Sequence, residues 1–223
     1  MNQLLAKVKS VEPITHDVLR ITTEKPSGYT FIPGQAAEIS INKTGWKNEK
    51  RPFTFTGLPE NDSLEFTIKT YPLHKGVTNQ LLHLKGEDTL ILHDVFGAIH
   101  YQGPGVFIAG GAGVTPFISI FRDLASKDAL GNNKLIFANK TQADIILENE
   151  FKKLLHQNFI NILSDEKVEG YAYGQITESF IEANLDEKNR TFYLCGPPPM
   201  MDSIEKQLTH LYGAKKTIIK EAF

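Results

Sequence analysis

The sequence predicts a two-domain protein of the β + α/β class, in which an antiparallel β-barrel over residues 1–101 is followed by a parallel α/β domain over residues 106–223. Three observations support this prediction. The first hundred residues form short segments that alternate apolar and polar side chains between frequent turn signals. After Tyr101–Gly105 the pattern changes to apolar runs separated by stretches of helical length, which is typical of βαβ units. The length of 223 residues is sufficient for two compact domains.

Composition and charge exclude several classes of protein. Lys and Arg number 24 against 26 Asp and Glu, a net charge of −2, so no overall positive field draws the chain to nucleic acid. Hydrophobic residues at 41% and charged residues at 22% exclude a disordered chain. The single cysteine, Cys195, excludes a disulfide framework, a Cys-rich zinc site and an iron–sulfur cluster held by four thiolates. The seven histidines show no metal-site spacing, so we expect no metal.

The N-terminal segment Met1–Ser10 does not resemble a signal peptide, because Lys7 and Lys9 interrupt it. The stretch Val95–Phe121 lacks formally charged residues, but glycines and prolines interrupt it, so we expect no membrane insertion. Together with the lone cysteine, these features favour a cytoplasmic location.

The first domain is predicted from strand-like alternation. Leu64–Lys69 alternates cleanly, and Val18–Ile21 and Glu38–Ile41 do so more briefly between Pro- and Gly-containing turns. About six such strands predict a small closed barrel. One helical insertion is expected near Thr78–Leu84.

The second domain is predicted from alternating apolar runs and amphipathic stretches. The expected parallel strands are Val106–Ala109, Lys134–Ala138, Phe159–Leu163 and Thr191–Cys195, with a closing strand Thr217–Ala222. The expected helices are Thr115–Ser126, Ala143–His156, Ile176–Leu185 and Pro198–Tyr212.

A glycine-rich turn, Gly110–Pro116, follows the first of these strands and opens a helix. In this context Gly110, Gly111, Gly113 and Thr115 are candidates for binding a pyrophosphate, because helix-terminal N–H groups and missing Cβ atoms allow a phosphate to approach the backbone, as in Rossmann-like domains. No Lys-Ser/Thr pair follows, which disfavours a Walker-type nucleoside triphosphatase. A tight strand-to-helix turn without a ligand is the alternative.

Two groups of residues in the barrel half are candidates for a flavin site. The first group is Arg51, Pro52, Phe53 and Thr54. Arg51 could bind a phosphate, the ring of Phe53 could pack on a planar ring system, and the Thr54 hydroxyl could form a hydrogen bond. The second group comprises Lys69 and Tyr71 at the end of the next strand and Gly76, Val77 and Thr78 at the start of the inserted helix. Taken singly, such patterns also occur by chance in strands without a ligand.

A proline-rich segment, Cys195–Met201, follows a predicted parallel strand at its carboxyl end, where open α/β sheets bind their ligands. Cys195, Gly196, Pro197 and Met200 are therefore candidates for a nucleotide site. The alternative for Cys195 is a small buried hydrophobic residue.

The chain resembles the ferredoxin-NADP reductase superfamily over its whole length. The motifs that carry the resemblance are, in order, Arg-Pro-Phe-Thr, Gly-Val-Thr, Gly-Gly-Ala-Gly-Val-Thr-Pro, Cys-Gly-Pro-Pro-Pro-Met and the terminal Glu-Ala-Phe. The segments Leu135–Thr141 and Asp144–Leu147 and the Cys-Gly-Pro-Pro-Pro run are most similar to its cytochrome-b5 reductase branch. The resemblance implies an FAD-binding β-barrel followed by a Rossmann-like NAD(P)-binding α/β domain, with hydride passing from nicotinamide to flavin.

The resemblance also implies roles for individual residues. Arg51 would bind the flavin pyrophosphate, Phe53 would pack on the isoalloxazine, and Thr54 would lie near its hydride-accepting nitrogen. Tyr71 and Thr78 would complete the site, and the helix at 76–84 favours FAD over FMN.

The implied catalytic residues are Thr54, Cys195, Glu221 and Phe223. Cys195 would lie beside the reactive nicotinamide carbon, Glu221 would balance the positive charge of the nicotinamide, and Phe223 would cover the flavin until the nicotinamide displaces it. Phe223 replaces the Tyr or Trp that is commoner in the family, which weakens any hydroxyl role there.

The predicted nicotinamide cofactor is NADH. In the cytochrome-b5 reductase branch an acidic residue precedes a Tyr-Gly-Gln by eight positions, and Asp165 stands eight before Tyr173. A carboxylate at the adenosine ribose accepts hydrogen bonds from free hydroxyls and repels a ribose phosphate. Lys167 provides a route to NADPH, and a solvated turn is the alternative reading of Asp165.

The expected partner is a small electron carrier, such as ferredoxin, flavodoxin or a haem protein, with the chain itself a monomer or weak dimer. The loop Asn42–Arg51 carries Lys43, Lys47, Lys50 and Arg51 around Trp46, and we interpret it as a basic rim with an exposed aromatic that docks an acidic carrier. A solvated hairpin loop is equally consistent. The competing functions are a non-catalytic nucleotide-binding electron-transfer subunit and a reductase of free flavins or quinones.

Overall fold

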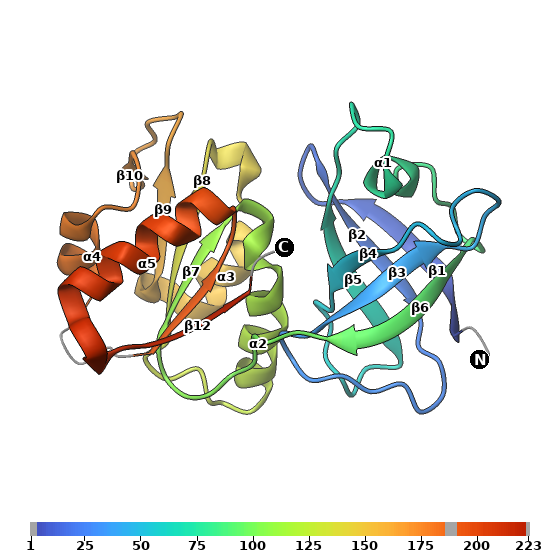
Figure 1. The fold of residues 1–223 in the computed structure, drawn as a ribbon, viewed down its shortest axis with the longest axis horizontal. Coiled ribbons are helices and arrows are strands. Elements are labelled where there is room, and N and C mark those ends of the chain that lie inside the picture. Colours follow the sequence, from blue (N-terminus) through green and yellow to red (C-terminus); the bar gives the residue numbers. More distant parts are fainter. Residues whose placement is uncertain (1–3, 186–190, 222–223) are drawn as a thin grey trace. The chain divides into compact units, whose positions relative to one another are not determined.

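The computed structural model describes residues 4–185 and 191–221 (Figure 1). The chain divides into two compact units. One comprises residues 1–100 together with 115–123, and the other comprises residues 101–114 together with 124–223. One unit contains an antiparallel six-stranded sheet and the other a parallel six-stranded sheet, so the predicted fold class is confirmed.

The antiparallel sheet has the strand order β4-β3-β6-β1-β2-β5. It closes at its two edge strands, because Phe55, directly after β4, forms a bridge with Phe66 of β5, and the Thr56 amide donates a 2.8 Å hydrogen bond to the Glu65 carbonyl. The short helix α1 (Val77–Leu81) lies between β5 and β6 in the sequence, as the predicted insertion does. The strands are β1 (Leu4–Pro13), β2 (Val18–Glu24), β3 (Ala36–Ile41), β4 (Arg51–Thr54), β5 (Ser63–Lys69) and β6 (Thr89–Phe96).

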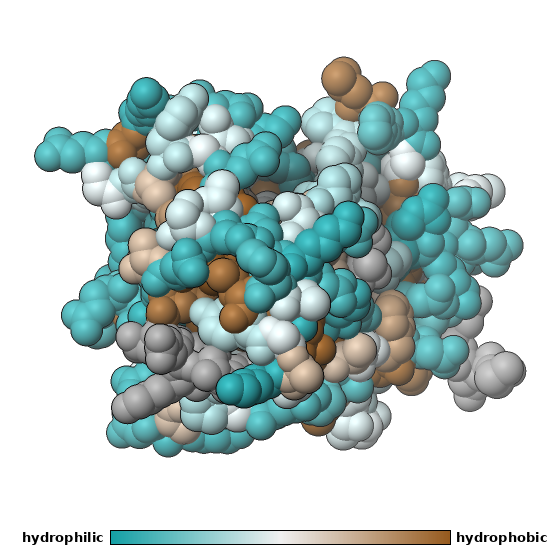
Figure 2. Space-filling view, turned by 60° about the vertical axis from the view of Figure 1, so that its left-hand side comes forward, coloured by the Kyte–Doolittle hydropathy of each residue, from teal (hydrophilic) through white to brown (hydrophobic). Residues whose placement is uncertain are grey.

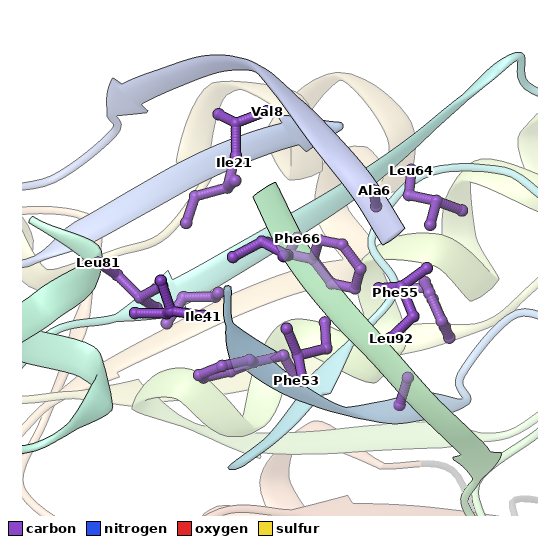
Figure 3. Close-up of a cluster of buried hydrophobic side chains, with 14 of the residues drawn as sticks. Ala6, Val8, Ile21, Ile41, Phe53, Phe55, Leu64, Phe66, Leu81 and Leu92 are labelled. Atoms are coloured by element: carbon purple, nitrogen blue, oxygen red, sulfur yellow. The ribbon is translucent and has the colours of Figure 1, made fainter. Parts of the chain in front are cut away.

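Aromatic and aliphatic side chains fill the barrel (Figure 3). Phe55 is fully buried, stacks on Phe31 with ring centroids 4.1 Å apart, and lies 5.2 Å from the ring of Phe66. Trp46, the only tryptophan of the chain, packs against this cluster from the loop between β3 and β4. The barrel therefore has a hydrophobic core of its own.

The parallel sheet has the strand order β10-β9-β8-β7-β11-β12. The chain runs outward from β7 to β10 on one side and then resumes at β11 on the other side of β7. The order therefore reverses between β7 and β11, and ligands of open α/β sheets bind beyond the carboxyl ends of the strands at such a point. The strands are β7 (Val106–Gly110), β8 (Lys134–Asn139), β9 (Phe159–Leu163), β10 (Ala172–Tyr173), β11 (Thr191–Cys195) and β12 (Thr217–Glu221).

Helices cover both faces of this sheet. Ile181 of α4 (Glu178–Asn184) and Ile204 and Leu208 of α5 (Pro198–Tyr212) share a buried cluster with Ile136 of β8. The neighbouring Phe137 points to the other face by strand alternation and meets Phe151 of α3 (Glu148–Leu155) edge to face, with centroids 6.4 Å apart. Helix α2 (Thr115–Ser126) follows the 3₁₀ turn Gly111–Val114.

The predicted helix Ala143–His156 is wrong in its first turn. The side chain of Asp144 accepts hydrogen bonds from the backbone and hydroxyl of Thr141, which closes a 3₁₀ turn at Gln142–Asp144. Leu147 then adopts a left-handed conformation with φ of 54°, and α3 begins only at Glu148. The closing strand is confirmed over Thr217–Glu221, and its predicted last residue, Ala222, lies outside the described residues.

Among the described residues, none of the helices combines the length and apolar character that crossing a bilayer requires.

Candidate functional site

Strand β4 presents the first group of predicted site residues. Arg51 is half exposed, its guanidinium lies 3.7 Å from the Glu49 carboxylate, and it donates a 2.6 Å hydrogen bond to the carbonyl of Lys50. An exposed ion pair of this kind contributes little stability, so a phosphate could replace Glu49 at small cost. The residue type and exposure of Arg51 therefore fit an anionic ligand.

Phe53 lies mainly in the barrel core. The residue is 9% exposed and belongs to the buried cluster, in which Figure 3 labels it. Most of its surface is thus used for packing within the barrel, and its contact with an isoalloxazine stays a prediction. Pro52, one position earlier on the strand, is exposed.

Thr54 and Thr115 are brought together although 61 positions separate them. The Thr115 hydroxyl donates a 3.3 Å hydrogen bond to Thr54 Oγ1, and both side chains are buried. Since Thr54 accepts in this bond, its own hydroxyl proton remains available to a further acceptor. The start of α2 is anchored to the same unit by Ser119, whose hydroxyl accepts a 3.0 Å hydrogen bond from the Gly34 amide.

The segment after β5 contains the remaining predicted residues of the barrel. Lys69 forms a 2.7 Å ion pair with Asp17, and exposed Tyr71 stacks on His74 with centroids 5.8 Å apart. The N-cap of α1 is Gly76, and a Cβ on it would meet nothing within 4 Å, so there is open space at this helix start. Val77, directly after it, is buried, which leaves its backbone N–H as the group available to a ligand. Thr78, the next residue, is partly exposed.

In the α/β unit, the loops after β7 and β11 pack directly against each other through glycines. A Cβ on Gly110 would lie 2.5 Å from the Met200 sulfur, and a Cβ on Gly113 would clash with the backbone carbonyl of Cys195 and lie 2.7 Å from the Cα of Gly196. Gly111 differs, because its φ is +51° and a Cβ there would meet open space. Gly110 and Gly113 thus permit close packing, and Gly111 permits the turn.

Cys195 and Glu221 lie side by side at the carboxyl ends of β11 and β12, where they are register partners. The Cys195 thiol is fully buried. Burial, with a smaller contribution from the negative charge of Glu221, raises the pKa of this thiol to about 12. The thiol is therefore protonated at neutral pH and is not a nucleophile. Pro197 follows as the N-cap of α5, and Phe223 lies outside the described residues.

Asp165 follows β9 and is exposed. Its amide donates a 2.9 Å hydrogen bond to the Lys140 carbonyl, and its carboxylate accepts one of 2.6 Å from the Ser164 hydroxyl. The Lys167 ammonium lies 4.8 Å from the centroid of the Tyr173 ring, which is a cation–π arrangement. The Asp165 carboxylate is thus held at the end of β9, while Lys167 of the same loop contacts the ring of Tyr173.

In the predicted basic rim the exposed aromatic is wrong, whereas the docking of an acidic carrier on its lysines stays a prediction. Trp46 is partly buried against the barrel core. Lys43 pairs with Asp88 at 2.7 Å and Lys50 with Glu38 at 3.3 Å, so carboxylates from other strands and loops offset these charges.

Sequence reasoning missed two polar clusters that hold the candidate site elements. In the barrel unit, the Arg122 guanidinium donates hydrogen bonds to the Glu65 carboxylate at 2.6 Å and to the Thr56 carbonyl at 2.8 Å, which ties α2 to β5. In the α/β unit, Tyr171 links the segment that follows Asp165 to α3. Only the Glu148–Lys152 ion pair of the second cluster has a visible sequence signal, its i,i+4 spacing.

Comparison with known proteins assigns both halves of the chain to families. Residues 2–114 match the family model of an FAD-binding domain, and residues 107–206 match that of an oxidoreductase NAD-binding domain. The expected cofactor classes, FAD and a nicotinamide dinucleotide, are confirmed by these matches.

Individual relatives agree with the domain families. The reductase component of propane 2-monooxygenase from Mycolicibacterium smegmatis is 31% identical over 217 residues, covering 88% of this chain and 61% of that protein. NADH-cytochrome b5 reductase 2 from Mycosarcoma maydis is 28% identical, covering 88% of this chain and 62% of that protein. The chain therefore spans less than two thirds of the length of these curated relatives.

A solved structure has the same fold over almost all of the chain. The flavohem-like FAD/NAD-binding domain of nitric oxide dioxygenase from Vibrio cholerae superposes with a TM-score of 0.85 at 22% identity, covering 98% of each chain. From its two domain matches, its fold and the order of its motifs, the chain belongs to the ferredoxin-NADP reductase superfamily.

Proposed function

We propose that this protein is an FAD-dependent NAD(P)H oxidoreductase that takes hydride from a nicotinamide, with NADH preferred, and delivers electrons to a small protein carrier. The observation that carries the proposal is the presence, in one chain, of an FAD-binding and an NAD-binding domain, each with its candidate residues gathered at strand ends. Bound FAD would supply the capacity to accept hydride and to release electrons singly.

The residues of the barrel have three roles in this proposal. Arg51 binds the flavin pyrophosphate in place of Glu49, and the Val77 N–H binds phosphate at the start of α1, where the Gly76 N–H already donates a 2.8 Å hydrogen bond to the His74 carbonyl. Thr54, oriented by the hydroxyl of Thr115, directs its own proton toward the flavin.

The residues of the α/β unit bind and orient the dinucleotide. The N–H groups of the Gly110–Gly113 turn bind its pyrophosphate, and the protonated Cys195 thiol keeps the strand end beside the nicotinamide ring uncharged. Glu221, beside it in the sheet, balances the positive charge that the nicotinamide acquires as hydride leaves.

The partner in this proposal is a ferredoxin, flavodoxin or haem protein, or an oxygenase component of the kind named for the propane 2-monooxygenase relative. We propose that the chain acts as a monomer or weak dimer in the cytoplasm. Figure 2 shows one face, on which hydrophilic residues predominate and hydrophobic residues form separate patches.

The first half-reaction provides the main test. We expect the purified protein to bind FAD and become yellow, and the yellow colour to bleach rapidly when NADH is added under anaerobic conditions. A protein that takes up no FAD, or that holds FAD which NADH does not reduce, contradicts the proposal and favours a non-catalytic subunit. A panel of acceptors offered to the NADH-reduced protein then distinguishes a carrier reductase from a reductase of free flavins or quinones.

The preference for NADH is tested by Asp165→Ser. Like charges in contact cost several kcal/mol. Removing the carboxylate should therefore shift the ratio of kcat/KM for NADH to that for NADPH at least roughly tenfold toward NADPH. The matched control is Glu169→Ser, which removes an exposed carboxylate from the same loop and should leave the ratio unchanged. An unchanged ratio in Asp165→Ser would remove this residue from the proposal.

A further inference from the structure

The loop that carries Asp165 is attached at two points to the segment after β8. The first attachment is a 2.8 Å hydrogen bond from the Gln142 amide to the Glu166 carboxylate. Because Glu166 is the neighbour of Asp165, this bond fixes the backbone beside the carboxylate that is proposed to face the ribose. Gln142 itself lies in the 3₁₀ turn that the Thr141–Asp144 capping box closes, so the loop is attached to an ordered element.

The second attachment is the hydroxyl group of Tyr171, at the other end of the loop. It accepts hydrogen bonds from the Gln142 side-chain amide at 3.2 Å and from the Lys152 ammonium at 3.1 Å, and it donates one to the Glu148 carboxylate. Lys152 and Glu148 also form a 2.8 Å ion pair, and the Lys152 ammonium lies 5.5 Å from the centroid of the Tyr171 ring. A single phenol thereby joins the loop to α3 and to the 3₁₀ turn.

The charges of this cluster stabilise one another. Burial acts to raise the pKa of Glu148, but hydrogen bonds from Lys152 and Tyr171 outweigh it and hold that pKa below its usual range. The hydrogen bond to Glu148 in turn raises the pKa of Lys152. Both groups are therefore charged at neutral pH, and they hold the Tyr171 hydroxyl between a donor and an acceptor.

We infer that Tyr171 is a positioning residue for nicotinamide selection, which it achieves by fixing the loop that carries Asp165; this inference rests on the proposed function. A carboxylate on a fixed loop accepts from the ribose hydroxyls without a loss of loop freedom on binding. The same fixed carboxylate cannot move away from a ribose phosphate. A rigid loop therefore strengthens the binding of NADH and at the same time weakens the binding of NADPH. A mobile loop would weaken both effects, and it would also release Lys167 from its place over Tyr173.

The experiment compares equilibrium binding of NAD⁺ and NADP⁺ to the FAD-loaded wild type and to Tyr171→Phe by calorimetry. These oxidised dinucleotides do not reduce the flavin, so the readout is independent of turnover. We expect the ratio of the two dissociation constants to shift roughly fivefold toward NADP⁺, about the effect of one lost hydrogen bond. A purely structural role would lower the fraction of binding-competent protein without changing this ratio.

Two further variants make the result decisive. Tyr29→Phe is the matched control, because it removes a buried phenol hydroxyl of the barrel that has no hydrogen-bond partner among the described residues, and it should leave the ratio unchanged. Gln142→Met keeps the backbone attachment to Glu166 but removes one donor to Tyr171, and it should shift the ratio in the same direction by roughly twofold. This variant tests the inference even if Tyr171→Phe does not fold.

The outcomes separate the inference from the proposed function. If the wild type binds neither dinucleotide, the proposed function fails. If the wild type prefers NAD⁺, and Tyr171→Phe and Gln142→Met keep that preference unchanged, only the role of Tyr171 is overturned.

Discussion

Replacing Gly113 with alanine is expected to destabilise the α/β unit by about 3 kcal/mol, a large share of the stability of a typical domain. The new Cβ would clash with the backbone carbonyl of Cys195 and approach the Cα of Gly196, and neither backbone can move as a flexible side chain would. Relief of the clash requires the loops after β7 and β11 to separate, which removes buried contacts at the carboxyl ends of both strands.

The chain contains natural probes for this measurement. Cys195 is its only cysteine and is buried in the α/β unit, and Trp46 is its only tryptophan and packs on the barrel core. In urea, Gly113→Ala should expose the Cys195 thiol to alkylation at a lower denaturant concentration than in the wild type. The control is Gly76→Ala, where the backbone is extended and a Cβ meets open space, and it should behave as the wild type. Equal thiol exposure in Gly113→Ala and the wild type would show that the two loops are not packed as described.

Replacing Arg122 with methionine is expected to destabilise the barrel unit by about 2 kcal/mol. The Arg122 and Glu65 side chains are only 19% and 21% exposed, and Arg122 also donates to the carbonyl of Thr56. Removing the guanidinium leaves the Glu65 carboxylate with the Thr56 hydroxyl at 2.8 Å and with Arg20, whose Nε lies 3.9 Å away. A partly buried negative charge would then lose its best donor.

Urea unfolding followed by the fluorescence of Trp46 gives the change in the free energy of unfolding. Lys50→Met is the matched control, since its ion pair with Glu38 is about 40% exposed on both sides and contributes little. A double-mutant cycle of Arg122→Met with Glu65→Gln should give a coupling energy above about 1 kcal/mol. A coupling near zero would mean that the ion pair does not hold α2 to the barrel.

The fold follows from patterns that the sequence displays directly. Alternation in Leu64–Lys69 marks a strand with one buried face, and the run Val106–Gly110 marks a strand buried on both faces. The predicted start of α3 is wrong because Ile145 and Ile146 continue an apolar pattern and are buried, but in a non-helical segment. The periodicity of burial does not reveal that Leu147 has a positive φ.

The candidate site was only partly predictable, for a different physical reason. Motif residues such as Thr54 and Cys195 were identified because their neighbours in sequence define the motif. The pairing of Thr54 with Thr115, and the ion pairs of Lys43 and Lys50, depend on residues that are distant in sequence and become neighbours only in the folded chain. The polar loop around Trp46 predicts an exposed ring, whereas the ring packs against the core from outside the strands.

The interlocked loops after β7 and β11 have a kinetic consequence. Since Gly110, Gly113 and Gly196 leave no gap between them, this part of the α/β unit is preformed and has little internal freedom to lose when a dinucleotide arrives. These two loops should then add no slow rearrangement step to the association of a dinucleotide. Differences in affinity between dinucleotides should consequently arise from how fast each one leaves.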